Sequence, residues 1–324
     1  MTNLFVIGNG FDLAHGLKTS YEDFKLYLME QVADIVEYEL VVPEGTEYPD
    51  GDIVYNTSEV ISMLLFLINE AELANKYTSK EGKDFIGFEI ETKWMDVETS
   101  LGNLDFDMVF DNISETEDDE WAVAANNSAL ADNLIKPVSM LLEYFTEWIN
   151  LITVHAIKPK VDFNKRIHKK DQFLTFNYTE TLEVVYKIKQ ENICHIHGKQ
   201  NQSIILGHGK RDNYTETISN IGSADGLNEI HNILRKDTDK CLRDNFKFFE
   251  NLSNCNVSKI YSYGFSFNDV DAVYLREICE KIDTEKVTWY FNDYNLSEVH
   301  QNVLEEELRS YGFQGDYGTY SVNF

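Results

Sequence analysis

The sequence predicts an α/β fold, a mostly parallel sheet with a large helical insertion after its first strand. An uninterrupted apolar run, 4–7, opens the chain, whereas further runs of β-forming residues begin only after residue 171 and alternate there with helical patterns. Residues 20–165 show helical spacing and hardly a strand signal. Because run 4–7 needs partners, we expect it at the centre of a sheet. The predicted α/β domain is 1–19 plus 166–324, and 20–165 is a helical subdomain.

Within the insertion, long helical patterns are joined by polar connections. The expected helices are 20–40, 58–77, 85–101 and 121–157, the last interrupted at Pro137. Residues 45–51 predict a loop, and the acidic run 105–120 predicts an exposed connection. The basic run 158–170, which follows the insertion's last helix, is expected to be a solvated loop.

After residue 171, short apolar runs alternate with amphipathic stretches. The expected strands are 172–176, 193–197, 203–206, 259–263 and 286–291. The expected helices are 179–190, 227–252, 270–282 and 296–311. This alternation is typical of a parallel sheet that is covered by helices on both faces.

The composition limits the kinds of partner. Asp and Glu outnumber Lys and Arg by 56 to 28, and the net charge is −28. A polyanion of this size repels nucleic acid and acidic membrane surfaces, so we expect neither as a partner. Four cysteines are scattered without a CxxC pair, no secretory signal is recognisable before the first strand, and no apolar stretch reaches the roughly 18 residues of a membrane span. These features predict a soluble, cytoplasmic protein with reduced thiols.

The first strand ends in Gly8-Asn9-Gly10, and Gly16 follows six positions later. Glycines at a strand-to-helix turn let the backbone approach a pyrophosphate, which then faces the free N–H groups of the helix. The same spacing also fits a tight turn that binds nothing. The turn is a candidate nucleotide site, with both interpretations open.

Polar residues follow other expected strands at the carboxyl edge of the sheet, where α/β proteins bind ligands. These segments are Thr175–Tyr178, His195–Gly198, Tyr263–Ser266 and Tyr290–Asp293. We therefore expect them to gather around the glycine turn.

Five segments of the sequence resemble the AbiH family of bacteriophage abortive-infection proteins of bacteria. They are GNGFDLAHGLKTSYEDF, KWMDVE, FNYTETLE, HIHG and YGFSFNDVD, and the resemblance runs from the first strand to about Leu275. A more distant similarity is to sirtuins and to the sirtuin-like NAD hydrolases of antiphage defence. The resemblance implies a Rossmann-like fold that binds NAD as a substrate, with no cofactor besides. We also expect a homo-oligomer or a partner protein of the same defence system.

This resemblance implies catalytic roles for His197, in the HG dipeptide, and for Asn177, in TFNYT. The chain departs from sirtuins because it lacks their zinc module of two CxxC pairs, carries Thr179 where the motif has Asp, and carries Asp12 where sirtuins usually have Ser. These departures count against protein deacylation and leave the hydrolysis of NAD to nicotinamide and ADP-ribose as the expected activity. The candidates for nucleotide binding are Gly8, Asn9, Gly10, Asp12, His15, Gly16, Thr175, Tyr178, Gly198, Gly264, Ser266, Asp269 and Asn292.

The expected chemistry suits these residue types. Breaking the bond between nicotinamide and ribose leaves an oxocarbenium-like centre, as in glycoside hydrolysis. A histidine can relay a proton from a ribose hydroxyl, and a fixed amide can orient water without adding a charge. His197 and Asn177 fit these two roles.

Alternatives remain open for the same residues. Asn177 could instead cap a helix that begins near Thr179. His195 and His197 share one strand face and could ligate a metal, with Asp269, Asp271 or His208 as further ligands. His195 alone fits a structural histidine. The alternative functions are a nucleotide sensor that binds without turnover and a metal-dependent phosphohydrolase or nuclease.

Overall fold

A computed structural model describes residues 2–32, 41–82, 101, 110, 119–209 and 220–322. The chain forms two compact units. One consists of Met1–Ser20, Ile149–Ile205 and Asp237–Phe324, and the other of Tyr21–Trp148 and Leu206–Lys236. The division of the sequence into domains 1–19 plus 166–324 and 20–165 stays a prediction.

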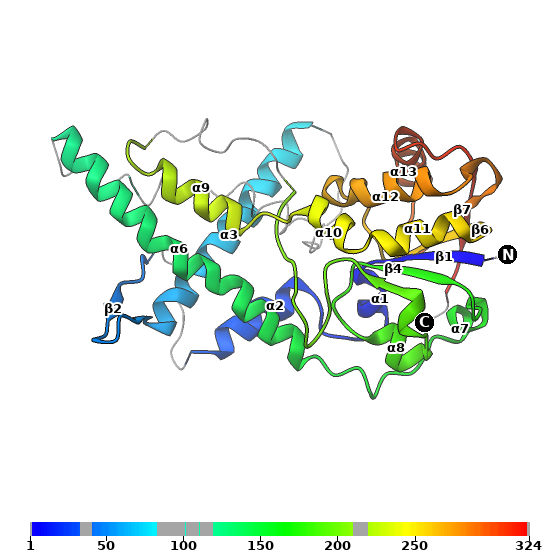
Figure 1. The fold of residues 1–324 in the computed structure, drawn as a ribbon, viewed down its shortest axis with the longest axis horizontal. Helices are drawn as coiled ribbons and strands as arrows, with labels where there is room; N and C mark the ends of the chain where they lie inside the picture. The colour runs from blue at the N-terminus through cyan, green and yellow to red at the C-terminus, as the bar shows by residue number, and fades with distance from the viewer. Residues whose placement is uncertain are drawn as a thin grey trace. The chain divides into compact units, whose positions relative to one another are not determined.

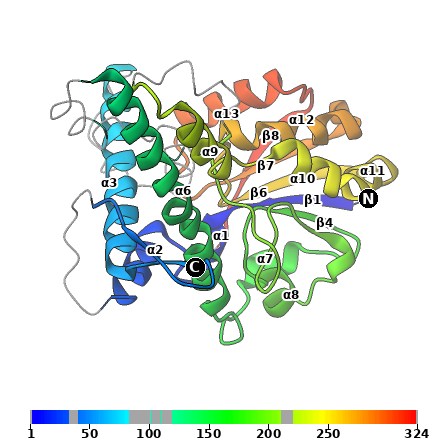
Figure 2. The same ribbon diagram turned by 60° about the vertical axis from the view of Figure 1, so that its left-hand side comes forward.

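The first unit contains a six-stranded sheet in the order β5-β4-β1-β6-β7-β8, and all neighbouring strands are parallel (Figures 1 and 2). The predicted α/β fold with a central first strand is therefore confirmed, since β1 pairs with β4 on one side and β6 on the other. The strands are β1 (Thr2–Ile7), β4 (Gln172–Thr175), β5 (Ile193–His195), β6 (Val257–Tyr263), β7 (Thr288–Asn292) and β8 (Asp316–Tyr320).

The strand order reverses its direction at β1. From β1 the chain adds β4 and then β5 on one side, and it afterwards returns to add β6, β7 and β8 on the other side. Adjacent parallel strands whose connections leave in opposite directions open a crevice at their carboxyl ends. This point lies between β1 and β6.

One face of the sheet is covered by α1 (Asn9–Ala14), α7 (Val161–Arg166) and α8 (Thr181–Tyr186), which contribute Phe11, Phe163, Leu182 and Tyr186 to its core. A row of aromatic rings crosses this face, from Phe173 over Phe5 and Tyr261 to Tyr290. Neighbouring rings are stacked with centroids 4.9, 5.1 and 5.1 Å apart. Such in-register cross-strand pairs stabilise the pairing of four strands.

The opposite face is covered by α10 (Thr238–Asp244), α11 (Phe246–Asn254), α12 (Ala272–Lys281) and α13 (Glu298–Ser310). Its core combines apolar side chains of β1, β4, β6 and β7 with those of the helices. Short 3-10 turns complete this unit at η1 (Gln190–Asn192), η3 (Asp269–Asp271) and η4 (Thr284–Lys286). The central strands β1, β4 and β6 are largely buried on both faces, as is usual for strands of a parallel sheet between two layers of helices.

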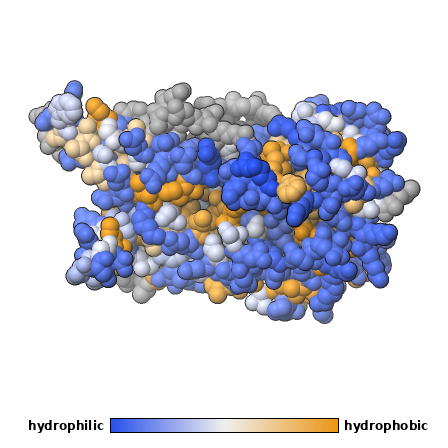
Figure 3. All heavy atoms as spheres, viewed as in Figure 1, coloured by the Kyte–Doolittle hydropathy of each residue, from blue (hydrophilic) through white to orange (hydrophobic). Residues whose placement is uncertain are grey.

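The second unit is mainly helical. It contains α2 (Tyr21–Glu30), α3 (Thr57–Gly82), most of α6 (Glu120–Leu151) and α9 (Ala224–Ile233), and its core includes a cluster in which Phe24 contacts Phe145 and Trp148. The Asn127 side chain of α6 donates a hydrogen bond to the Ile221 carbonyl. Among the residues that the structure describes, no helix combines the length and hydropathy of a membrane span. Hydrophilic residues dominate the face drawn in Figure 3.

Several sequence predictions for residues 20–170 are wrong in detail. Residues 45–51 do not form a plain loop, because β2 (Gly45–Glu47) pairs with β3 (Ile53–Tyr55) as an exposed hairpin. Pro137 does not interrupt α6, since a proline removes one N–H donor and the remaining turns of a 32-residue helix compensate. The basic run 158–170 contains α7, which buries Phe163. The expected helix 20–40 ends at Glu30.

The predicted elements of the α/β part also need corrections. Residues 203–206 are not a strand: Ile204 is buried, but the Ile205 N–H bonds to the His197 carbonyl outside the sheet. Strand β8 was missed because its sequence, DYGTY, is polar and carries an edge-strand glycine. The stretch 227–252 is divided among three helices. The predicted helix 85–101 and connection 105–120 lie mostly outside the described residues.

Candidate functional site

The glycine turn after β1 lies directly against the turn after β6. The Gly8 N–H donates to the Tyr263 carbonyl and the Gly10 N–H to the Gly264 carbonyl, each at 3.0 Å. A Cβ on Gly8 would overlap the Gly264 carbonyl oxygen, and a Cβ on Gly10 would lie 2.7 Å from the Gly264 Cα. Gly264 has φ +61°, and a Cβ there would overlap the Phe11 nitrogen. Packing between the two turns therefore accounts for all three glycines, and their contact with a pyrophosphate stays a prediction.

Gly16 has a different role, because it ends α1. It has φ +76°, its N–H bonds to the Leu13 carbonyl, and the Leu17 N–H bonds to the Asp12 carbonyl. This is the hydrogen-bond pattern of a Schellman motif, which favours glycine at this position. At the start of the same helix, the Asn9 side chain donates to the Thr19 carbonyl at 2.8 Å and so fixes the following loop.

Asn177 follows β4 and is held through its main chain. Its N–H donates to the Thr175 hydroxyl at 3.1 Å, and its carbonyl accepts from His195 Nδ1 at 3.0 Å. The residue is only 6% exposed, yet neither polar atom of its side-chain amide has a hydrogen-bond partner among the described residues. The helix-cap interpretation is wrong, because α8 begins at Thr181 with Glu180 at the N-cap position.

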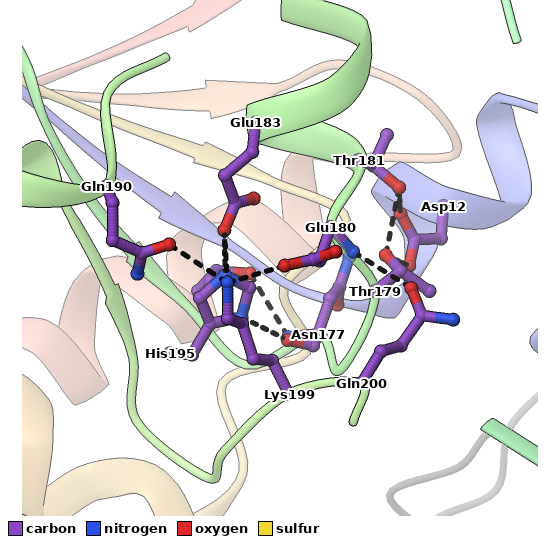
Figure 4. Close-up of polar contacts among 11 residues, drawn as sticks. Asp12, Asn177, Thr179, Glu180, Thr181, Glu183, Gln190, His195, Lys199 and Gln200 are labelled. Atoms are coloured by element: carbon purple, nitrogen blue, oxygen red, sulfur yellow. Dashed lines mark hydrogen bonds and ion pairs between the residues drawn. The ribbon is translucent and has the colours of Figure 1, made fainter. Parts of the chain in front are cut away.

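Asp12 lies in a buried polar cluster with Thr179 and Thr181, which follow Asn177 in the chain (Figure 4). The Thr179 hydroxyl donates to Asp12 Oδ2 at 2.6 Å, and the Thr181 hydroxyl donates to Oδ1 at 2.9 Å. Burial raises the pKa of Asp12 to about 6, against the opposing effects of both threonines, the Asn177 amide and the charge of His195. The Asn177 amide is near enough to act on this pKa, although it makes no hydrogen bond of ordinary geometry to the carboxylate.

His195 connects the Asn177 segment to a partly buried group of charged side chains (Figure 4). Its Nε2 lies 3.0 Å from Glu183 Oε1. The Lys199 ammonium donates to Glu183 and, at 2.6 and 2.9 Å, to Glu180 and Gln190. Burial alone would raise the pKa of Glu183, but the hydrogen bond and charge of His195 and the charge of Lys199 lower it below its usual value. His195 is therefore anchored by protein groups at both ring nitrogens.

His197 lies apart from His195. It is 3% exposed, and its Nε2 lies 3.1 Å from the Tyr274 hydroxyl and 3.8 Å from Asp271 Oδ1. Its ring is 5.5 Å from the ring of Phe176, the neighbour of Asn177. The expectation that the two histidines share a strand face is wrong, because β5 ends at His195 and the chain turns before His197. In the described parts of the chain, no group of three or more His, Cys, Asp or Glu side chains has a metal-binding arrangement.

The remaining candidates are distributed around this edge of the sheet. His15 is buried with Nδ1 at the Phe11 carbonyl and Nε2 at the Tyr186 hydroxyl, both at 2.6 Å, and burial lowers its pKa. The Tyr178 hydroxyl donates to the Ile205 carbonyl. Gly198 has φ +83°, and a Cβ there would overlap the Ser203 carbonyl oxygen.

On the β6 side, Ser266 and Asp269 are exposed before α12, Ser266 on a loop and Asp269 at the start of η3. Between them, Phe267 has φ +57°, a strained conformation for an aromatic residue. Asn292 ends β7, one strand beyond β6, and accepts a hydrogen bond from the Tyr294 N–H.

Sequence reasoning missed several residues of the site. Glu183, Lys199 and Thr181 were not singled out, although Glu180 and Glu183 lie one helical turn apart in the FNYTETLE segment. Tyr274 was also missed, since a tyrosine on a helix face looks like any core residue. Only the fold brings its hydroxyl to His197.

The family model described as bacteriophage abortive infection AbiH matches residues 4–293. No curated protein and no solved structure matches the chain.

Proposed function

Because the chain belongs to the bacteriophage abortive infection AbiH family, which implies a role in abortive infection by phage, we propose that it hydrolyses NAD to nicotinamide and ADP-ribose. NAD is then a substrate, and no further cofactor is needed. The proposed products follow from breaking the bond between the nicotinamide nitrogen and the ribose carbon, to which water adds a hydroxyl group while a proton is released. Loss of cellular NAD would arrest an infected cell.

The observation that carries the proposal is the buried Asn177 amide. A buried amide without hydrogen bonds costs about 1–3 kcal/mol, so such groups are rare in folded proteins. Asn177 lies at the carboxyl end of β4, next to β1, and both atoms of its amide lack a partner among the described residues. A bound hydroxyl or water would supply a hydrogen bond that this amide lacks.

The topology supports a dinucleotide as the ligand. The sheet has the order 3-2-1-4-5-6 when its strands are numbered as they follow one another along the chain. Sheets of this order bind dinucleotides at the carboxyl ends of their strands, where the order reverses. Here the glycine turn after β1 and the Gly264 turn after β6 lie at that point.

The proposed roles follow from the chemistry of the two side chains. His197 relays the proton of a ribose hydroxyl, which supports attack on the oxocarbenium-like carbon. Asn177 orients the attacking water or the ribose as a neutral amide, so no anion traps the cationic centre. Nicotinamide leaves as a neutral molecule and needs no general acid.

The two alternative functions predict different results with the purified protein. A nucleotide sensor binds NAD or ADP-ribose and leaves NAD intact. A metal-dependent phosphohydrolase cleaves the pyrophosphate instead and stops in chelator, but His195 and His197 contact different partners, which does not favour a shared metal. We propose to incubate the protein with NAD labelled in the nicotinamide ring, with and without chelator, and to separate the products. Free nicotinamide in both arms supports hydrolysis. The homo-oligomer and the defence-system partner stay predictions.

A further inference from the structure

We propose that Asp12 is a positioning residue that turns the Asn177 amide so that its oxygen, and not its nitrogen, faces the substrate. The inference rests on the proposed function for its meaning in catalysis. Its structural content, the orientation of one amide by one carboxylate, can be tested in the protein alone.

Asp12 is fixed by the segment that carries Asn177. Both of its oxygens accept hydroxyl groups from this segment, those of Thr179 and Thr181, two and four residues after Asn177. The carboxylate is 1% exposed and comes from α1, directly after the glycine turn. The contact therefore joins the end of β1 to the end of β4.

The main chain of Asn177 has no freedom to reorient, because Thr175 holds its N–H and His195 holds its carbonyl. Only the side-chain torsions remain. An ionised carboxylate accepts hydrogen bonds and donates none. The Asn177 amide lies near enough to Asp12 to lower its pKa. It is therefore stable with Nδ2 toward Asp12, whereas Oδ1 toward Asp12 would place two acceptors together. In this orientation Oδ1 points away from Asp12 and can accept from a ribose hydroxyl or from water.

The orientation depends on the charge of Asp12. A protonated carboxyl has a donor and can bond to Oδ1, which would favour the opposite orientation of the amide. The charged group that acts on Asp12 from the neighbouring strand is His195, which is itself paired with Glu183, and Glu183 also binds Lys199. Burial of Asp12 raises its pKa to about 6, so the change of orientation falls within a range that is accessible to experiment.

The direct test is NMR of the side-chain amide of Asn177 in the full chain without nucleotide, between pH 5 and pH 8. The resonance is assigned by its loss in Asn177→Ala. We expect its shifts to follow a single titration near pH 6 and to become independent of pH in Asp12→Asn. A resonance that does not titrate overturns the proposal. A titration that survives in Asp12→Asn also overturns it, since Asp12 would then not be its source.

A second variant changes the pKa of Asp12 and keeps its carboxyl group. Thr179→Val keeps the side-chain volume but removes a hydrogen bond that lowers the pKa of Asp12. We expect the titration midpoint of the Asn177 amide to rise by about half a unit or more. The matched control is Thr284→Val, at a buried threonine whose hydroxyl bonds to the Gly312 carbonyl, and it should leave the midpoint unchanged. Equal midpoints in the two variants contradict the proposal.

A kinetic arm links the orientation to turnover. We expect kcat for NAD to fall below the same midpoint in the wild type, and to be about tenfold lower and nearly independent of pH in Asp12→Asn, with KM changed less than threefold. If NAD is not cleaved at all, the proposed function fails while the NMR result still decides the role of Asp12. If NAD is cleaved with the same kcat and pH profile in Asp12→Asn, the positioning role fails alone.

Discussion

The Nδ1 atom of His195 lies 3.0 Å from the main-chain oxygen of Asn177, so a side chain of β5 fixes the segment that carries the Asn177 amide. His195 is fixed in turn, because its other ring nitrogen contacts Glu183. His195, which the sequence offered as a possible metal ligand, thus anchors the main chain of Asn177.

We expect His195→Ala to lower kcat about tenfold, the effect of losing one hydrogen bond worth about 1.4 kcal/mol, with KM nearly unchanged. The loss should be smaller than that of His197→Ala, because His195 acts only through Asn177. Steady-state kinetics with NAD measures both. His155→Ala, at an exposed histidine, is the control. Full activity in His195→Ala would show that the Asn177 segment does not need this anchor.

The raised pKa of Asp12 makes a prediction for stability. The pKa is about 6 in the folded protein and 3.8 when unperturbed, so the folded protein binds this proton more tightly than the unfolded chain. The stabilising effect of the proton is complete below pH 4 and is lost as the pH rises through 6. Above pH 6, keeping Asp12 ionised costs about 3 kcal/mol.

Asp12→Asn removes this cost. We expect the variant to be more stable than the wild type at pH 8, by up to about 3 kcal/mol, and the difference to disappear near pH 4. Urea unfolding of both proteins at several pH values measures it. A variant that is less stable at pH 8, with a difference that does not change with pH, would show that the carboxylate stabilises the fold.

The packing of the two glycine turns predicts unequal effects of alanine. Gly264→Ala places a methyl group against the Phe11 nitrogen at φ +61°, so we expect a loss of more than about 3 kcal/mol. Gly16→Ala meets no atom within 4 Å and should cost only about 1–2 kcal/mol for its φ of +76°. Urea unfolding compares the two. Similar losses would contradict the packing argument.

The same geometry decides which variants can test nucleotide binding. Gly10→Val cannot do so cleanly, because its Cβ would lie 2.7 Å from the Gly264 Cα whether or not a ligand binds. Substitutions at Asn177 leave the two turns intact.

Tyr274 gives a test of the surroundings of His197. Its ring is completely buried and its hydroxyl lies 3.1 Å from His197 Nε2. Tyr274→Phe keeps the ring and removes the hydroxyl, so we expect kcat to fall about tenfold. The melting temperature should stay within a few degrees of the wild-type value. Tyr317→Phe removes a comparable hydrogen bond, to the Glu305 carbonyl, and serves as the control. Equal kcat values in the two variants would leave the Tyr274 hydroxyl without a role.

Much of the fold could be predicted from the sequence. The apolar run 4–7 had no partner nearby, which placed β1 in the centre of a sheet that forms from residues after 171. Strand β8 could not be found this way, because an edge strand needs few apolar residues. The exposed hairpin β2–β3 was missed because Pro43, Pro49 and Gly51 indicated a loop, although β3 carries the apolar run Ile53–Tyr55.

The site was only partly predictable. Motif resemblance pointed to Asn177 and His197, since each follows a strand of the sheet. It could not tell that the fold uses Asp12 to hold Thr179 and Thr181, because this contact joins positions 167 and 169 residues apart. The sequence pattern also predicted a strand that continues to His197, whereas β5 is only three residues long and ends at His195.

The most direct test of the account is the release of nicotinamide from labelled NAD by protein purified from uninfected and from phage-infected bacteria. We expect the wild type to form nicotinamide and ADP-ribose in equal amounts. His197→Ala and Asn177→Ala should each lower kcat about 100-fold or more, with little change in NAD affinity by calorimetry, and the two losses should not multiply in the double variant. Both variants should also lose protection against phage. Intact NAD in every wild-type preparation that binds it, or single variants that cleave NAD as fast as the wild type, would contradict the account.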